Sequence, residues 1–401
     1  VFEEKGGFDV MIGNPPYGAS VARRDWAEIK TRYVGASRAR NSAAAFLALP
    51  FECVHERGVA CQIVPKSVTF SAGWSATRRL IWETGSLVGS ADVSQAFEGV
   101  LLEQEVLIYR VRPGQETRPR GWALRGEAFV ETHRVPLTTL KRHDTIMNHL
   151  PPAAGALVER LAEECQPLEL HTLTRRGAGW QALIVDEDLP HPQPRRCRFQ
   201  VSQGERGALG HLVPVLRGRD VRQFGLARAL PRIAVDAGMA GRLGAMAMPK
   251  IVSQNIIAHI TQPYDTLVAI SALDRAGLAA LDTVNMTIPR RQCPFPLEFL
   301  VALLNSSFAR WYFYFVIYNR AVRTMHFDAP YAGKLPVPAA AGGEIDTVCS
   351  LAEELARVQE GEETKYFLHG QHPAYDALDG AIFRLYGLSD EEIRLVLREK
   401  D

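Results

Sequence analysis

An asparagine, two prolines and a tyrosine stand together near the start of the 401-residue chain, at Asn14, Pro15, Pro16 and Tyr17. An amino group on an aromatic ring is a poor nucleophile because its lone pair is delocalised into the ring. Two fixed acceptors can hold both of its hydrogens, draw the nitrogen toward tetrahedral geometry and free the lone pair for attack. We predict that the side-chain oxygen of Asn14 and the main-chain carbonyl of Pro15 are these acceptors.

The two prolines and the tyrosine fit the same chemistry. Consecutive prolines fix φ and restrict the residue before each of them, so the Pro15 carbonyl is held in one direction. The ring of Tyr17 offers a face on which a planar base can stack. The alternative is a proline-rich turn after a strand, capped by Asn14. The apolar residues 8–12 before the motif and the tyrosine after it favour the active-site interpretation.

The first part of the chain, residues 1–112, alternates apolar strands with amphipathic helices. This alternation predicts an α/β fold with an open, largely parallel sheet and helices on both faces. In such sheets ligands bind beyond the carboxyl ends of the strands, which is where Asn14 follows the first strand. The expected strands are 8–13, 59–65, 87–94 and 105–113, all buried, and the expected helices are 41–58 and 73–85.

Composition divides the rest of the chain into three parts. Residues 113–150 are polar and rich in Pro, Gly and Arg, which is typical of a connector. Residues 151–340 mix short helical and strand-like pieces and predict an α+β domain, in which 297–318 is a buried helix because it is apolar nearly all round. Residues 341–401 have helical periodicity, and Ser389 followed by Glu392 is the signature of a capping box.

The overall composition excludes few classes of protein. Hydrophobic residues make up 47% of the chain and charged residues 23%, and the formal net charge is +1. No apolar run is long enough for a membrane span. The six cysteines have no zinc-like spacing and no metal site is predicted, so free thiols in a reducing, cytoplasmic setting are expected. A near-neutral charge does not exclude DNA binding, since one face can still be basic.

Residues 8–18, "FDVMIGNPPYG", resemble the catalytic motif of the N6-adenine-specific DNA methyltransferases of restriction-modification systems. Residues 43–68 are similar to the helix, turn and strand that follow this motif in the family. Residues 93–111 resemble a later motif whose phenylalanine, here Phe97, lies opposite the tyrosine. The resemblance implies a partial Rossmann-like methyltransferase sheet, with Asn14 to Tyr17 as catalytic residues. It also implies that Tyr17 and Phe97 stack on an adenine flipped out of double-stranded DNA.

The rest of the chain resembles the Taq-type C-terminal specificity domain of these enzymes. The similar segments are 212–224, 249–256, 299–313, 333–338 and the ending 381–396. The resemblance implies that residues 1–112 are the C-terminal part of the catalytic domain, 151–340 the target-recognition domain and 341–401 a helical C-terminal segment. It does not imply which side chains contact bases.

The chain departs from the family in one respect. The family's glycine-rich motif for S-adenosylmethionine and the acidic residue that holds the cofactor ribose lie upstream of the catalytic motif. Thirteen residues precede Asn14 here, and they contain no strand, glycine-rich loop and helix in succession. We therefore expect a C-terminal fragment that is inactive alone, with the cofactor region on a missing N-terminal half or on another subunit, and the chain's own cofactor-binding residues unknown.

Two other functions remain open from the sequence. The chain could be a non-catalytic DNA-recognition module, or the specificity portion of a fused restriction enzyme, in which residues 151–340 bind a sequence and the first domain is silent. A methyltransferase acting on protein glutamine amides shares the motif but does not need so large a C-terminal region. We recognise no nuclease motif, in which two acidic residues and a lysine follow a strand.

Overall fold

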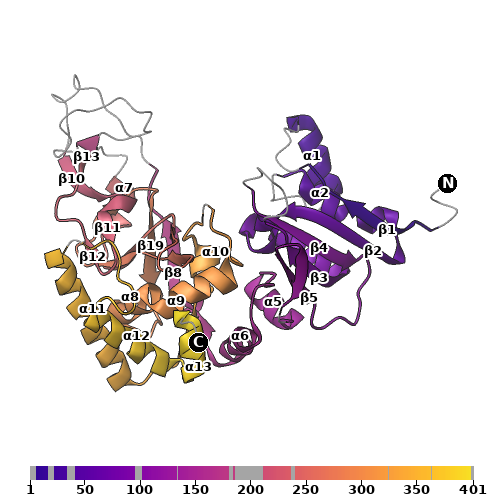
Figure 1. Cartoon of the computed structure of the whole chain (residues 1–401). Helices are drawn as coiled ribbons and strands as arrows, with labels where there is room; N and C mark the ends of the chain where they lie inside the picture. Colours follow the sequence, from indigo (N-terminus) through magenta and orange to yellow (C-terminus); the bar gives the residue numbers. More distant parts are fainter. Residues whose placement is uncertain are drawn as a thin grey trace. The chain divides into compact units, whose positions relative to one another are not determined.

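The computed structural model describes residues 6–16, 22–33, 41–94, 102–132, 134–179, 184–185, 211–235, 240–323, 325–362 and 364–398 (Figure 1). Two compact units make up the chain. The first unit comprises Val1–Glu163 and Phe313–Ala321, and the second comprises Glu164–Tyr312 and Val322–Asp401. Residues 313–321 thus belong to the first unit, although they lie between two segments of the second unit in the sequence.

The first unit is an α/β structure around one six-stranded sheet. Short helical segments precede and follow the strands, and residues 72–84 form one continuous helical stretch of mixed 3-10, α and π character, as the sequence predicted for 73–85. Its elements are β1 (Phe8–Gly13), α1 (Arg23–Arg32), α2 (Ala43–Ala48), α3 (Pro50–Cys53), β2 (Val54–Pro65), η2 (Lys66–Thr69), η3 (Ala72–Trp74), α4 (Ser75–Arg79), η4 (Leu80–Thr84), β3 (Ser86–Asp92), β4 (Gln104–Arg110), β5 (Arg120–Arg125), β6 (Ala128–Glu131), α5 (Leu137–His143) and α6 (Pro152–Glu164).

The sheet is mixed, and the expectation of a largely parallel sheet is wrong. Its strand order is β1-β2-β4-β3-β5-β6. The pairs β1–β2 and β3–β5 are parallel, whereas β2–β4, β3–β4 and β5–β6 are antiparallel. A parallel pair needs a crossover of a dozen or more residues, usually a helix, and only residues 93–103 separate β3 from β4.

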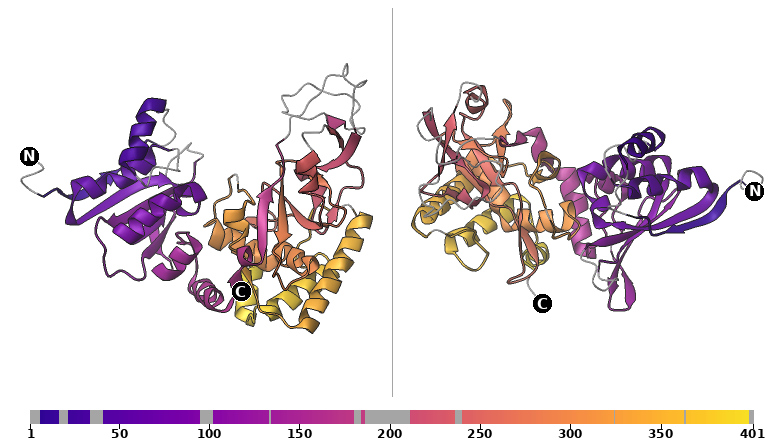
Figure 2. Two further views of the ribbon diagram at one scale, coloured as in Figure 1. Left: turned by 180° about the vertical axis from the view of Figure 1, so that it is seen from behind. Right: turned by 90° about the horizontal axis from the view of Figure 1, so that it is seen from above.

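The first strand also differs from the prediction. Among the described strands β1 pairs with β2 alone and is the edge strand of the sheet; it is the strand nearest the N-terminus in Figure 2. Its apolar side chains are exposed rather than buried: Phe8 is 44% exposed, Val10 56% and Ile12 78%. An apolar strand in parallel pairing is normally covered on both faces. The sequence pattern of β1 is therefore that of an interior strand, while its position within this chain is that of an edge.

The predicted helix over 41–58 ends five residues early, at Cys53. β2 begins at Val54, a β-branched residue that pairs with Phe8 of β1. Gly58, which the sequence suggested as the residue after a helix end, lies inside β2. A Cβ atom at Gly58 would lie 2.7 Å from the Asp9 carbonyl oxygen, so the glycine permits the close approach of β1.

Residues 113–150, which the composition suggests as a connector, contribute two strands to the sheet. β5 pairs with β3, and β6 forms a hairpin with β5. All four residues of β6 are exposed although three of them are apolar, so the polar residues around β5 and β6, rather than β6 itself, gave the segment the composition of a connector.

The second unit contains two four-stranded sheets, β17-β14-β19-β8 and β18-β10-β13-β9, and helices packed against the first of them. Its elements are β7 (Gln166–Pro167), η5 (Leu168–Leu170), β8 (Thr172–Arg176), β9 (Ile184–Val185), β10 (His211–Leu216), η7 (Gly218–Asp220), β11 (Val221–Arg222), β12 (Gly225–Leu226), β13 (Arg232–Val235), α7 (Ala240–Gly244), β14 (Lys250–Gln254), β15 (Ala258–Ile260), β16 (Thr266–Val268), β17 (Ser271–Asp274), β18 (Ala279–Ala280), β19 (Val284–Pro289), α8 (Leu297–Asn305), α9 (Ser307–Tyr312), α10 (Ala329–Ala332), β20 (Pro336–Val337), α11 (Gly342–Glu362), α12 (Pro373–Leu385) and α13 (Asp390–Leu397). The remaining helical segment, η8 (Phe313–Ile317), belongs to the first unit.

The apolar segment 297–318 is buried, as its composition predicted, but it is not one helix. It breaks at Ser306 into α8 and the continuous α9 and η8. Within the described ranges no single helix is long and apolar enough to cross a membrane, although α8 taken together with 307–317 reaches that length and composition.

The C-terminal residues are helical as predicted, and α11 and α12 lie side by side (Figure 1). The predicted capping box is confirmed: the Glu392 backbone N–H donates to Ser389 Oγ, and the Ser389 N–H donates to Glu392. The five cysteines among the described residues are free thiols.

Candidate active site

Three strands of the first unit end at the same edge of the sheet. β1 runs parallel to β2, and β3 runs in the same direction because both β2 and β3 are antiparallel to β4. Asn14 follows β1, Lys66 follows β2 and Asp92 closes β3. Polar side chains therefore gather at the carboxyl edge of the sheet, which is where ligands bind in open sheets of this kind.

The motif residues Asn14, Pro15 and Pro16 are described, and they leave the sheet directly from β1. The last residue of β1, Gly13, is in register with Gln62 of β2. Asn14 is exposed and Pro15 is buried. Tyr17 and Phe97 lie outside the described residues, so their predicted stacking roles stay predictions.

The carbonyl of Pro16 has a defined partner. Ser42, which precedes α2, donates its hydroxyl hydrogen to Pro16 O at 2.5 Å. Asn14 itself is exposed, and its carboxamide carries an acceptor oxygen and a donor NH2 group. An amide oxygen of this kind can accept a hydrogen from an exocyclic amino group.

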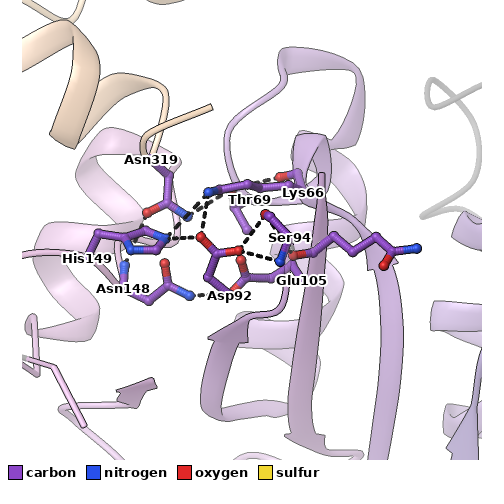
Figure 3. Close-up of polar contacts among 9 residues, drawn as sticks. Lys66, Thr69, Asp92, Ser94, Glu105, Asn148, His149 and Asn319 are labelled. Atoms are coloured by element: carbon purple, nitrogen blue, oxygen red, sulfur yellow. Dashed lines mark hydrogen bonds and ion pairs between the residues drawn. The ribbon is translucent and has the colours of Figure 1, made fainter. Parts of the chain in front are cut away.

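A buried polar cluster that the sequence analysis did not identify lies at the same edge of the sheet (Figure 3). At its centre the Asp92 carboxylate accepts hydrogen bonds from Lys66 Nζ at 2.8 Å and from His149 Nε2 at 2.7 Å. The same carboxylate accepts the Ser94 backbone N–H at 2.9 Å and the Ser94 hydroxyl at 2.5 Å. One carboxylate therefore joins the end of β2, the end of β3 and the residues before α6.

Electrostatics favour the ionised form of Asp92 at the centre of this cluster. Burial opposes ionisation of Asp92, but the hydrogen bond from His149 and the charge of Lys66 outweigh it and hold the pKa of Asp92 well below its usual range. Burial lowers the pKa of His149 to about 4, because the opposing contribution from Asp92 is smaller. At neutral pH the cluster is thus an ion pair between Lys66 and Asp92 with a neutral imidazole that donates from Nε2.

A second carboxyl group, Glu105 on β4, lies next to this cluster and is fully buried (Figure 3). Burial and the nearby charge of Asp92 raise the pKa of Glu105 well above its ordinary value. Asn148 Nδ2 donates to Glu105 Oε1, while Glu105 Oε2 and Asn148 Oδ1 have no hydrogen-bond partner among the described residues. A protonated Glu105 carries a hydrogen that can be donated, so the neutral acid suits this site better than the carboxylate.

The pKa of His149 leads to a prediction about acid stability. A histidine whose folded pKa lies below its unfolded value binds a proton more readily after unfolding, so its contribution is fully present above pH 6.5 and is lost as the pH falls toward 4. The difference between the unfolded and folded pKa values of His149 corresponds to about 3 kcal/mol of unfolding free energy in the first unit. Urea unfolding of wild type and His149→Gln at several pH values between 7 and 4 measures it.

We expect the unfolding free energy of the wild type to fall more steeply with acid than that of His149→Gln, because glutamine keeps a donor for Asp92 but does not titrate. Parallel pH profiles for the two proteins would contradict the assigned protonation state.

The sequence offered one signal for the cluster. Lys66 directly follows the predicted strand 59–65, and Asp92 lies near the carboxyl end of the predicted strand 87–94, where a polar residue is a candidate site residue. His149 carried no such signal, since it lies in a segment that looked like a connector. Among the described residues no group of three or more His, Cys, Asp or Glu side chains could hold a metal ion.

Comparisons with known proteins found one matching family model and several similar structures. Residues 1–97 match the family model described as Eco57I restriction-modification methylase. The structure of the Type IIL restriction-modification enzyme MmeI in complex with DNA is similar with a TM-score of 0.62 at 10% sequence identity, over 97% of this chain and 56% of that chain. A nuclease-deletion mutant of the Type ISP enzyme LlaGI, in complex with a DNA substrate mimic, gives a TM-score of 0.45 at 8% identity, over 89% of this chain and 42% of that chain.

Curated protein sequences gave no match. The chain spans little more than half of the MmeI chain, and at 10% identity the likeness concerns the fold. The chain thus shares its fold with part of the MmeI chain, and its residues 1–97 match the family model of a restriction-modification methylase.

Proposed function

We propose that this chain is the C-terminal part of a site-specific DNA methyltransferase that transfers the methyl group of S-adenosylmethionine to the N6 atom of adenine in a restriction-modification system. One observation carries the proposal: Asn14, Pro15 and Pro16 follow the carboxyl end of β1 directly, within the region that matches a restriction-modification methylase. MmeI, whose fold is similar, was solved in complex with DNA.

In this proposal the chain's own residues bind and orient the target amino group. The Asn14 side-chain oxygen and the Pro15 carbonyl each accept one hydrogen of the adenine N6 amino group, so that the nitrogen lone pair points away from the ring plane. Preorganised acceptors of this kind lower the barrier without a general base in the first step. Tyr17 and Phe97 are proposed to stack on the flipped base, whose extrusion costs a few kcal/mol.

The described residues do not by themselves supply a site for S-adenosylmethionine. No strand of the six-stranded sheet is followed by a glycine-rich loop that opens a helix within the described ranges. The cofactor would supply an electrophilic methyl group, and we propose that a region beyond this chain, an N-terminal half or another subunit, binds it.

The exposed edge strand supports this division of the enzyme. β1 has the apolar sequence of an interior parallel strand, yet Val10 is 56% exposed and Ile12 is 78% exposed. Unpaired backbone groups along such an edge are a template for a further strand. We propose that strands of the cofactor-binding region pair with β1 and cover Phe8, Val10 and Ile12, which places the cofactor beside Asn14.

This division predicts the ligand binding of the chain alone. We expect no S-adenosylmethionine binding in titration calorimetry, because the described strands of the first unit are not followed by a glycine-rich loop that could hold the cofactor. We expect weak binding to a DNA duplex whose affinity falls as salt rises, because phosphate contacts with arginines release counterions. Cofactor binding at micromolar concentration by this chain alone would mean that the cofactor site lies within it.

The proposed reaction is tested by combining the chain with its cofactor-binding region. The complete protein is incubated with S-adenosylmethionine and DNA of varied sequence, and the digested nucleosides are identified by mass spectrometry. N6-methyladenine is the expected product. Methylation at cytosine N4 would overturn the adenine assignment, and DNA binding without any methylated base would favour the non-catalytic recognition module.

A further inference from the structure

A buried serine holds the last carbonyl of the described motif. Ser42 is 7% exposed, and its Oγ donates to Pro16 O at 2.5 Å across 26 residues of sequence. Serine at the start of a helix usually accepts a backbone N–H of the first turn through its oxygen. Here Ser42 makes no such capping bond, and Asn41 Oδ1 accepts the Ala43 N–H at 3.0 Å instead. The hydroxyl hydrogen of Ser42 is therefore directed to the motif.

The Pro16 carbonyl matters because few torsions separate it from the Pro15 carbonyl. The Pro16 ring fixes φ, so ψ of Pro16 is the remaining free torsion between the two peptide planes. A hydrogen bond to Pro16 O restrains that torsion. On the other side, Gly13 is held in the β1–β2 ladder opposite Gln62. The segment from Asn14 to Pro16 is thus fixed at both of its ends.

Ser42 can act as a fixed donor because the helix after it is bound to the sheet. Gln62 of β2 donates its side-chain N–H to the Phe46 carbonyl at 2.7 Å. Tyr109 of β4 donates its hydroxyl to the Leu47 carbonyl at 2.7 Å. Leu47 itself is fully buried. Two neighbouring carbonyls of α2 are therefore bound by side chains from two adjacent strands, which fixes the position of α2 and of Ser42 before it.

We propose that Ser42 is a positioning residue for methyl transfer, which fixes the direction of the Pro15 carbonyl through its hydrogen bond to Pro16. The inference rests on the proposed function, since it assigns the Pro15 carbonyl to the target amino group. Ser42 does not contact the base in this scheme. Loss of its hydroxyl is therefore expected to slow the chemical step without weakening the binding of DNA.

The test compares single-turnover methylation rates at saturating DNA and cofactor in the complete protein. Ser42→Ala is expected to lower the rate constant by about 10- to 100-fold, because a misplacement of about 1 Å costs up to about 100-fold. The DNA dissociation constant should stay within twofold of wild type. Ser42→Thr, which keeps the hydroxyl, should restore most of the rate. Ser42→Cys keeps the size but is a weak donor, and it replaces the alanine variant if that variant does not fold.

Ser306 provides a matched control, because it is also a buried serine whose hydroxyl donates to a backbone carbonyl, that of Leu303 at 2.8 Å. Ser306→Ala should lower the melting temperature by a similar amount and leave the methylation rate within twofold of wild type. Equal slowing by the two alanine variants would overturn the positioning role, and so would an unchanged rate in Ser42→Ala.

Asn14→Ala separates failure of this inference from failure of the proposed function. An inactive Asn14→Ala protein together with a fully active Ser42→Ala protein refutes the inference alone. Full activity in both variants refutes the proposed function.

Discussion

Replacing Asn14 by alanine is expected to lower the rate of methyl transfer by about 100-fold or more in the complete protein. Removal of one preorganised polar group from an active site typically costs about 100- to 1000-fold in the rate constant. The DNA dissociation constant is expected to stay nearly unchanged, because the side chain would contact the flipped base rather than the duplex. Radiolabelled methyl transfer and a fluorescence binding assay measure the two quantities.

The conservative variant Asn14→Asp provides the matched comparison. A carboxylate oxygen also accepts a hydrogen bond from the amino group, so this variant should keep measurable activity. The alanine protein is expected to unfold at the wild-type urea concentration, since Asn14 is exposed and a surface substitution changes stability by about 0.5 kcal/mol at most. Methyl transfer within about tenfold of wild type in Asn14→Ala would rule out the assigned role, because tenfold is only about 1.4 kcal/mol of barrier.

Replacing Lys250 by methionine is expected to destabilise the second unit by about 3–5 kcal/mol. Lys250 and Asp274 form an ion pair in which both side chains are fully buried. The ammonium group also donates to the carbonyls of Met246 at 2.8 Å and Leu278 at 3.0 Å. Methionine keeps the length of the side chain but leaves the Asp274 carboxylate without its counter-charge in the core. Urea unfolding followed by tryptophan fluorescence measures the change.

An exposed ion pair shows whether burial causes the effect. Arg32 Nη2 lies 2.7 Å from Glu52 Oε2, and the two side chains are 64% and 38% exposed. Arg32→Met is expected to change the unfolding free energy by no more than about 1 kcal/mol, because water and salt screen such pairs. Comparable destabilisation by the two methionine variants would contradict the argument from burial.

Four of the six strands in the first unit's sheet followed from local patterns, whereas β5 and β6 did not. The strands at 8–13, 59–65 and 105–113 were predicted because continuous apolar runs of this length favour buried strands. The capping box at Ser389 was predicted because its hydrogen bonds join residues three apart in sequence, which are neighbours in any helix. The helix over 41–58 was predicted too long because Gly58 fits a helix end and a close strand contact equally well.

The arrangement of the strands was not predictable in the same way. A run of apolar residues predicts a strand, but it does not specify which strands are its neighbours. β4 lies between β2 and β3 and is antiparallel to both. This arrangement depends on pairings between residues far apart in sequence, such as Gln62 with Leu107. The exposure of β1 could not be predicted either, because its residue pattern is that of a strand covered on both faces.

The sequence by itself determined the chemical identity of the candidate site: Asn14, Pro15, Pro16 and Tyr17 are consecutive, so their types and order alone indicate acceptors for an amino group and a stacking ring. Only the tertiary structure decided what surrounds the motif. Ser42 donates a hydrogen bond to Pro16, which lies 26 residues away in sequence. Asp92 contacts Lys66, 26 residues away, and His149, 57 residues away. Such contacts form where strand ends meet at one edge of a sheet, and that meeting depends on long-range pairing rather than on local residue preference.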